Sequence, residues 1–340
     1  MLSCLNQINL IRYLIVWRVN SSLVFFPRFQ AIDFSDVLGS IICQRLPTSE
    51  KKQWTKALTP LKNIIEQIKN KKLHATDLKF PDSSWPLKTT IFVYPNKRTF
   101  GKDELIFWEL KLFGDDADHG LFLEVLLPAM EEACVTANPE WNSRNRLWGH
   151  FDILNIYAAR GSSWQPFVSN GKLDLTCRVN PQQWLQDLQL QPKVYHPLKY
   201  VDWILPADFT DDLAGYYALA LPDEKQKLKF KQAPPLSLIL FSLIQRISRL
   251  LYEPKKRSTK IEDVLKTDDQ EAFWQAIRGT LQINIAEKKL HRVPRSWPGK
   301  FCGAQKYSSI PEAIIPYLNI ASILHVGRFT HFGCGTFVLR

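Results

Sequence analysis

The order in which apolar patterns follow one another in the first 160 residues constrains the fold most. The segments are, in chain order, a strand or hairpin at 9–26, a helix from 33 or 35 to 45, a more polar helix at 53–72, strands at 89–94 and 105–113, a helix at 121–134 and a strand at 147–159. Apart from the one added helix, this order is that of a ferredoxin-like βαββαβ unit.

A second, weaker copy of the same pattern follows. Its segments are a strand at 225–232, helices at 236–252 and 268–277, strands at 280–285 and 297–306, a helix at 311–325 that begins with proline, and a strand at 336–339. We therefore predict an α+β fold with two tandem ferredoxin-like, RNA-recognition-like domains. The predicted units are an N-terminal domain at 1–160, a linker with insertions at 161–224, and a C-terminal domain with a glycine-rich loop at 225–340.

The charge of the chain favours a polyanionic partner. The formal net charge is +11 and the isoelectric point is about 9.3. Residues 288–340 contain eight basic residues and one acid, Glu312, so +7 of the +11 lies in this stretch. Such clustering is typical of a protein that binds a phosphate backbone, although charge alone fits an anionic membrane surface or a merely soluble basic protein equally well.

Cysteine spacing and apolar runs exclude several other classes. The six cysteines are far apart and form no CxxC pair, so we expect reduced thiols, no structural metal and no cofactor. Arg12 and Arg18 interrupt the apolar N-terminal run, and Arg246 and Arg249 interrupt the run at 236–252. We therefore predict neither a signal peptide nor a membrane span, and we expect a cytoplasmic protein without a membrane partner.

A glycine loop near residue 330 is the first candidate for RNA binding. Gly327, Gly333 and Gly335 can adopt positive φ and allow a phosphate to approach the backbone. Within the loop, Arg328 offers a charged contact, and Phe329 or Phe332 offers a surface on which a base can stack. An ordinary tight turn before an edge strand is the alternative interpretation.

A basic stretch at 288–300 is the second candidate, because it combines phosphate-neutralising side chains with an aromatic ring. Its candidate contacts are Lys288, Lys289, Arg292, Arg295, Trp297 and Lys300, and the separate run at Lys255, Lys256 and Arg257 adds further charge. A solvated basic loop would have the same composition.

Histidine positions give no catalytic assignment by themselves. Seven histidines are present, and only the loose pair His325 and His331 approaches a metal-ligand spacing. The sequence has no nucleophile elbow, no Walker motif and no dinucleotide fingerprint. A structural role is the simpler interpretation for each histidine taken alone.

Four further segments form a set of motifs: the strand end 107–114 (FWELKLFG), residues 228–236 with Leu228, Phe230 and the pair Pro234-Pro235, the strand 299–307 (GKFCGAQKY), and the loop 327–335 (GRFTHFGCG). In this order they resemble motifs of the CRISPR repeat-processing endoribonucleases, the sixth Cas family within the RAMP superfamily. The order of the segments is more specific than any one of them.

The resemblance implies binding of CRISPR repeat RNA and metal-independent cleavage of the precursor transcript to mature guide RNA. In that reaction the 2′-hydroxyl attacks the neighbouring phosphate, which requires a base, an acid and a cation near it. It also implies retention on the product within an effector complex, with other Cas subunits as partners.

The chain departs from the family at the expected catalytic histidine, because residues 33–52 contain none. The nearby polar candidates are Tyr13, Arg28, Lys51 and Lys52, and the histidines that could replace the missing base are His119, His325 and His331. We take Tyr13, Lys51, Lys52 and His331 as the catalytic candidates. Two alternatives remain open, namely a non-catalytic RNA-binding RAMP subunit of an effector complex and a general basic nucleic-acid or membrane-surface protein.

Overall fold

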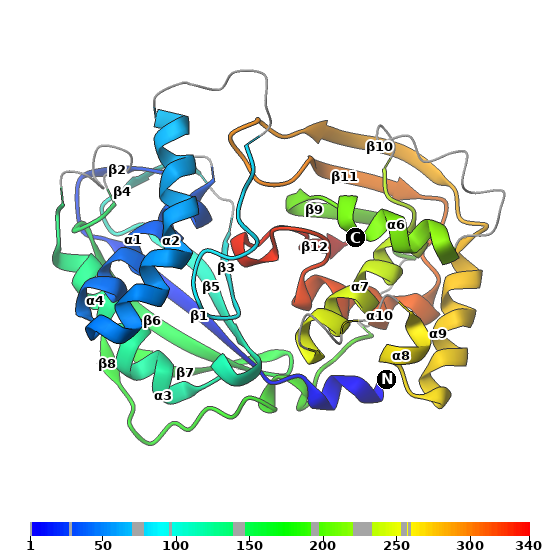
Figure 1. Ribbon diagram of the computed structural model, residues 1–340, viewed down its shortest axis with the longest axis horizontal. Coiled ribbons are helices and arrows are strands. Elements are labelled where there is room, and N and C mark those ends of the chain that lie inside the picture. The colour runs from blue at the N-terminus through cyan, green and yellow to red at the C-terminus, as the bar shows by residue number, and fades with distance from the viewer. Residues whose placement is uncertain are drawn as a thin grey trace.

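The structure is a computed structural model that describes most of the chain. The described residues are 2–26, 29–69, 78–94, 97–138, 147–191, 197–219, 233–252, 257 and 260–340. They form two halves, each with a sheet and helices, that lie side by side (Figure 1).

The first half is built on an antiparallel sheet with the strand order β3-β5-β1-β6-β7-β8. The strands are β1 (Leu10–Val19), β3 (Thr89–Val93), β5 (Leu105–Phe113), β6 (Phe151–Arg160), β7 (Ser163–Ser169) and β8 (Lys172–Leu173). Its first four strands have the ferredoxin-like order, in which the first strand lies between the third and the fourth. A separate two-stranded sheet pairs β2 (Leu23–Phe25) with β4 (Thr99–Gly101).

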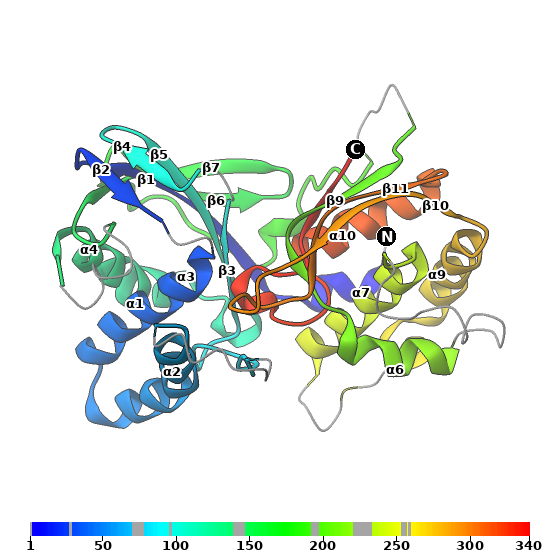
Figure 2. The same cartoon turned by 90° about the horizontal axis from the view of Figure 1, so that it is seen from above.

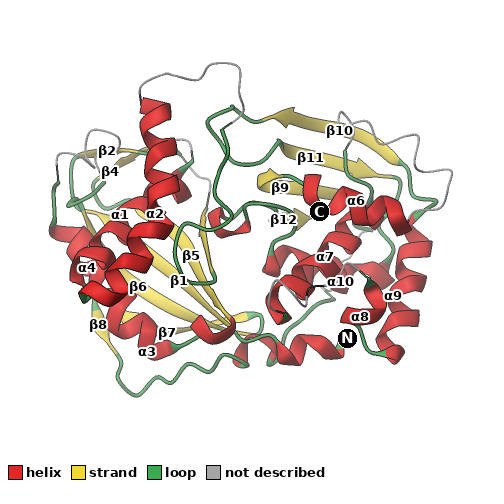
Figure 3. Cartoon of the chain, viewed as in Figure 1, coloured by secondary structure: helices red, strands yellow, loops and turns green. Residues whose placement is uncertain are grey.

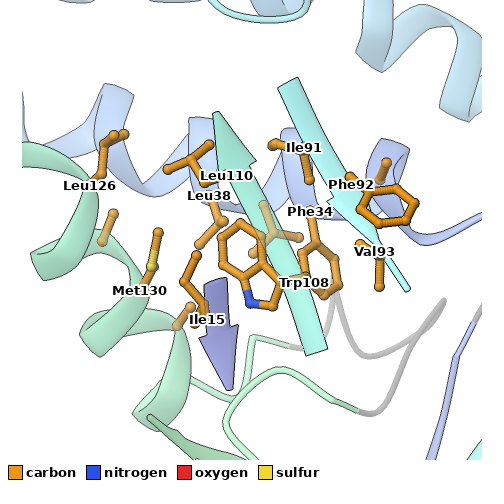
Figure 4. Close-up of a cluster of buried hydrophobic side chains, with 14 of the residues drawn as sticks. Ile15, Phe34, Leu38, Ile91, Phe92, Val93, Trp108, Leu110, Leu126 and Met130 are labelled. Carbon is orange, nitrogen blue, oxygen red and sulfur yellow. The ribbon is translucent and has the colours of Figure 1, made fainter. Parts of the chain in front are cut away.

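Helices cover one face of this sheet (Figure 3). They are α1 (Gln30–Arg45), α2 (Thr48–Lys69) and α4 (Leu127–Val135), and α4 continues a helical stretch that begins with α3 (His119–Leu121) and the π-helical turn Phe122–Leu126. Figure 4 shows Trp108 and Leu110 of β5 packed against Phe34 and Leu38 of α1, with the rings of Phe34 and Trp108 5.4 Å apart. Because α1 lies between the sheet and α2, almost all of its residues are buried.

The second half repeats the same topology with four antiparallel strands in the order β10-β11-β9-β12. The strands are β9 (Tyr200–Ala207), β10 (Ile285–Arg292), β11 (Phe301–Tyr307) and β12 (Phe337–Leu339). The helices are α6 (Thr210–Leu219), α7 (Leu236–Leu251), α8 (Ile261–Val264), α9 (Thr267–Thr280) and α10 (Ile315–Leu324). The predicted fold of two tandem ferredoxin-like units is thus confirmed.

Two details of the second unit differ from the sequence prediction. Its first strand is β9, which lies within the stretch 161–224 that we expected to be a linker, together with β7 and β8. The alternation of buried Val201, Trp203 and Leu205 with partly exposed residues is the strand pattern that the prediction overlooked. The predicted strand at 225–232 lies outside the described residues. The predicted strand at 280–285 is wrong, because the chain there leaves α9 through a turn and pairs only from Ile285 onward.

Each half contributes residues from near one end of the chain to the hydrophobic core of the other half. Leu2, Leu5 and Ile8 belong to the hydrophobic core of the second half, and the indole of Trp184 donates a hydrogen bond of 3.0 Å to the carbonyl of Ile8. Conversely, Phe332 belongs to the core of the first half. In Figure 1 the N-terminal segment accordingly lies beside α8, below the second sheet.

None of the helices in the described part of the chain is both long enough and apolar enough to cross a membrane.

Candidate functional site

The glycine loop, residues 327–335, connects the last helix to β12 and lies between the two halves of the molecule. Gly327, Gly333 and Gly335 have φ of 83°, 79° and 77°, in the left-handed region that the sequence analysis expected. Phe329 also adopts positive φ, at 58°. The loop therefore turns tightly through four residues with left-handed backbone conformation.

The three glycines are needed for close packing of backbone against backbone. A Cβ on Gly335 would overlap the carbonyl oxygen of Val326, and one on Gly327 would overlap that of Asp208. A Cβ on Gly333 would lie 2.9 Å from the carbonyl oxygen of Ile91 in the other half. All three glycines are buried, and protein atoms occupy the space beside their backbone. The prediction that a phosphate approaches this backbone is therefore wrong for this conformation.

Aromatic side chains hold the loop against the first half. Phe332 is fully buried, with its ring centroid 6.5 Å from that of Phe29 and 6.2 Å from that of Phe80. Phe329 and Trp297 are only partly buried, and they contact Phe80 at 5.8 Å and Phe29 at 5.5 Å. Phe332 is thus unable to stack on a base in this conformation, whereas Phe329 and Trp297 keep an exposed surface.

Arg328 is the charged member of the loop, and it already has protein partners. Its guanidinium lies 3.1 Å from the carboxylate of Asp211 and 4.7 Å from the ring centroid of Phe329. Its backbone N–H donates to the carbonyl of Asp208. Since the side chain remains 30% exposed, a phosphate can compete with Asp211 for it.

The other predicted RNA contacts are mostly on the surface. Lys288, Lys289 and Arg292 are exposed on β10, an edge strand, and Lys289 forms an exposed ion pair with Glu287 at 3.0 Å. Arg295 and Lys300 are exposed in the following loop and at its end, and Arg257 is exposed before α8. Lys255 and Lys256 lie outside the described residues.

A buried polar network, which the sequence analysis did not predict, joins the two halves beside the glycine loop. The ammonium of Lys111 donates to the carbonyl of Ile323 at 2.5 Å and to Nε2 of His325 at 2.8 Å. Glu109 lies 3.8 Å from this ammonium and accepts a 2.6 Å hydrogen bond from Arg12. The only sequence signal was the presence of charged residues at alternate positions of an otherwise apolar strand.

The hydrogen bonds fix the tautomer of His325. Its Nδ1 lies 2.9 Å from the carbonyl oxygen of Gly333, which can only accept, so Nδ1 carries the proton and Nε2 accepts from Lys111. Burial lowers the pKa of Lys111 to about 7 and, with the nearby charges of Lys111 and Arg246, lowers the pKa of His325 well below its usual value. His325 is thus a neutral structural residue.

The four catalytic candidates are divided between core and surface. Tyr13 is fully buried on β1, where its hydroxyl lies 2.9 Å from Nδ1 of His119 and burial raises its pKa. His331 is buried against Phe332, and burial followed by the charge of Arg246 lowers its pKa to about 3. Because both side chains are buried, Tyr13 and His331 do not contact a phosphate directly in this conformation. This corrects their prediction as catalytic residues.

Lys51 and Lys52 are exposed in the first turns of α2. His119, which begins α3, is half-buried, and burial lowers its pKa. Among the described residues, no group of three or more His, Cys, Asp or Glu side chains is placed to hold a metal ion.

By its architecture this is a protein of two tandem ferredoxin-like units with a buried glycine loop between them. The family model for CRISPR-associated endoribonuclease Cas6 matches residues 216–337, which include the glycine loop and most of the second unit. The predicted resemblance to the sixth Cas family is confirmed over these residues. No curated protein matches the sequence.

Several solved structures are similar in outline. A chain of a partial Cas6-RT-Cas1–Cas2 complex is 10% identical with a TM-score of 0.47, and the match covers 98% of this chain and 46% of that one. A Cas6 product complex is 16% identical with a TM-score of 0.43, covering 97% and 100%. A Cas6-related protein from Pyrococcus furiosus is 9% identical with a TM-score of 0.35, covering 97% and 98%. The chain thus spans less than half of the first of these, and 29% of the chain in a second Cas6-RT-Cas1–Cas2 complex. With TM-scores below 0.5, the fold assignment rests on the strand order itself.

Proposed function

We propose that this protein binds CRISPR repeat RNA and cleaves the precursor transcript to give guide RNA. The match of residues 216–337 to the Cas6 endoribonuclease family is the observation that carries the proposal. The exposed basic strand β10 and the basic loop after it supply the charge that such a partner needs.

The cleavage we propose is metal-independent, since an RNA strand carries its own nucleophile in the 2′-hydroxyl. The 2′-oxygen gives up its proton to a base and attacks the adjacent phosphorus, which forms a 2′,3′-cyclic phosphate and breaks the bond to the 5′ oxygen, and the 5′ oxygen takes up a proton. The protein then has to orient the strand and stabilise the added charge on the phosphorane. Lys51 and Lys52, exposed at the start of α2, are the cationic candidates for this stabilisation.

The proposal also includes that the protein keeps the processed RNA bound and associates with other Cas subunits. The solved Cas6-RT-Cas1–Cas2 chains contain a segment similar in outline to this chain, which motivates a search for such partners. Purification of the protein from cells that carry a repeat array should recover processed repeat RNA, and recovery of unrelated RNA would count against retention.

Cleavage of repeat RNA in EDTA tests the central proposal. The purified protein should cut the unmodified RNA in EDTA, and a 2′-deoxy substitution at the cut site should abolish cleavage without loss of binding. Replacement of Lys51 and Lys52 by alanine should slow cleavage more than it weakens binding. Cutting of the 2′-deoxy RNA would refute attack by the 2′-hydroxyl.

A non-catalytic RNA-binding subunit is the second candidate. Two observations favour it: residues 33–52 contain no histidine, and Tyr13, His325 and His331 are buried. Tight binding of repeat RNA without any cleavage would establish this candidate. Equal affinity for unrelated hairpins would instead indicate a general basic nucleic-acid-binding protein.

A further inference from the structure

In the described part of the chain, no α-helix covers one face of the first sheet. Successive side chains of β1 alternate, so Ile15 and Trp17 are buried beneath the helices while Leu14 and Arg18 on the other face are partly exposed. In Figure 2 each sheet has its helices on the side away from the other half, so the uncovered faces of the two sheets are turned toward each other.

The second half covers only one end of this open face. At that end Lys111 bonds to His325, and the guanidinium of Arg246 lies 5.0 Å from the ring centroid of Phe113. Phe113, Lys111 and Phe107 share the open face, because they alternate along β5. At the other end of the face, at the start of β5, none of the described residues of the second half covers the sheet, and Phe107 is 38% exposed.

Two aromatic rings lie side by side at the uncovered end. Phe107 and Tyr94 are each 38% exposed, and the backbone N–H of Tyr94 donates to the carbonyl of Phe107 at 3.1 Å, so the two residues are neighbours on adjacent segments. The buried ring of Phe92 supports Tyr94, with centroids 4.5 Å apart. Val16 pairs with Phe107 on the central strand and forms an apolar base beside it.

We propose that this uncovered end binds unpaired nucleotides of an RNA, with bases stacked on Tyr94 and Phe107. Stacking needs a base with a free face, which an unpaired nucleotide has and a base inside a duplex lacks. Aromatic rings on the open face of an antiparallel four-stranded ferredoxin-like sheet are an established arrangement for such stacking. The inference rests on the proposed RNA-binding function and adds a subsite for the unpaired part of the RNA.

Charge and size favour RNA over a protein at this subsite. The facing sheet carries Lys289 on β10 and, on β11, Lys306, whose ammonium lies 5.4 Å from the ring centroid of Tyr200. The register places both lysines on the open face together with Tyr200 and Glu287, and there the lysines can neutralise phosphates in competition with Glu287, which pairs with Lys289. Two half-exposed rings offer far less than the roughly 1,000 Å² that a stable protein interface buries, yet they suffice for one or two bases.

Binding measurements with two RNAs test the subsite. One RNA is a repeat hairpin with unpaired flanks, and the other is the same hairpin with blunt ends. Tyr94→Ala and Phe107→Ala should each weaken binding of the flanked RNA about tenfold and leave the affinity for the blunt hairpin unchanged. Tyr94→Trp should restore binding, because it keeps a stacking surface.

Phe25→Ala is the matched control. Phe25 is an exposed aromatic residue of similar exposure, 47%, on β2. Within β2 the neighbouring residue Val24 is buried, so Phe25 points to the opposite, solvent-exposed side of the strand, and it does not line the small pocket that contains Tyr94 and Phe107. The control should bind both RNAs as the wild type does.

Each outcome decides the matter. Wild-type affinity of both alanine variants for the flanked RNA would overturn the subsite while leaving the proposed function intact. Equal losses on both RNAs would also overturn it, since the effect would then not depend on unpaired nucleotides. Failure of the wild-type protein to bind either RNA would refute the proposed function, and the subsite with it.

Discussion

Nε2 of His325 accepts a hydrogen bond from the ammonium of Lys111, and through this pair the end of the last helix is joined to a strand of the other half. The two atoms are 2.8 Å apart, and both side chains are buried. The Nδ1 side of the same ring contacts the carbonyl of Gly333. One imidazole therefore orders the glycine loop and connects the two sheets.

Lys111→Met should lower the free energy of unfolding by about 3 kcal/mol, because the carbonyl of Ile323 and Nε2 of His325 would both lose their buried donor. Denaturant unfolding of the variant measures this difference. Lys62→Met, at an exposed position of α2, is the control and should stay within about 0.5 kcal/mol of the wild type. Equal stability of the two variants would contradict a structural role for the network.

Acid should destabilise the protein through His331. In the unfolded chain this histidine takes up a proton near pH 6.5, whereas in the folded protein it does so only near pH 3. Between these values the unfolded state binds more protons, so the stability that is present above pH 6.5 is lost as the pH falls. At pH 4.5 the loss from this group is about 3 kcal/mol.

His331→Leu isolates this contribution. Nε2 of His331 has no hydrogen-bond partner among the described residues, so the replacement should change stability little at pH 7.5. Urea unfolding at pH 7.5 and 4.5 should show a smaller acid loss in the variant than in the wild type. An unchanged acid loss would mean that other groups, such as His325, account for it.

Gly335→Ala should be strongly destabilising, by more than about 3 kcal/mol, because φ is 77° and the new Cβ would overlap the carbonyl oxygen of Val326. Gly279→Ala provides the opposite case within the same chain. Gly279 lies near the end of α9, and an added Cβ would meet nothing within 4 Å beyond its own helix backbone, so alanine there should stabilise the protein by up to about 1 kcal/mol. Thermal unfolding of both variants tests the contrast.

Arg328→Ala should weaken RNA binding and lower the dependence of log K on log salt by about one phosphate contact. Asp211→Asn is the informative partner variant, since it removes the carboxylate that competes for the guanidinium and should strengthen binding. Affinities measured over a range of salt concentrations give both slopes. An unchanged slope for the alanine variant would remove Arg328 from the RNA contacts.

The sequence was sufficient for the parts of the fold that depend on local patterns. The amphipathic helix α7, Leu236–Leu251, and the strand–helix order of the first unit follow from periodicity. Periodicity also marks β9, but its short run of alternating residues sits among loops, and only pairing with β11 and β12 identifies it as the central strand of a sheet.

The candidate site was predicted less well, for a physical reason. Spacing located the glycine loop and its left-handed residues, but burial decides what a glycine or histidine can contact, and burial depends on elements distant in sequence. Gly333 lies against Ile91, and His325 contacts Lys111, in both cases more than 200 residues apart. Pairs of this kind leave no local pattern, so Lys111 was overlooked and His331 was taken as a catalytic candidate.

The exchange of ends between the halves has a consequence for synthesis on the ribosome. Residues 2–8 emerge before the core that receives them exists, and the core of the first half stays incomplete until Phe332 has been made. Domains that fold as units during translation can complete their cores one at a time. In this protein neither core is complete until residues of both halves have been made. A nascent chain paused between the halves would expose apolar surface at both places, so the first half has to stay soluble until residue 332 has been made.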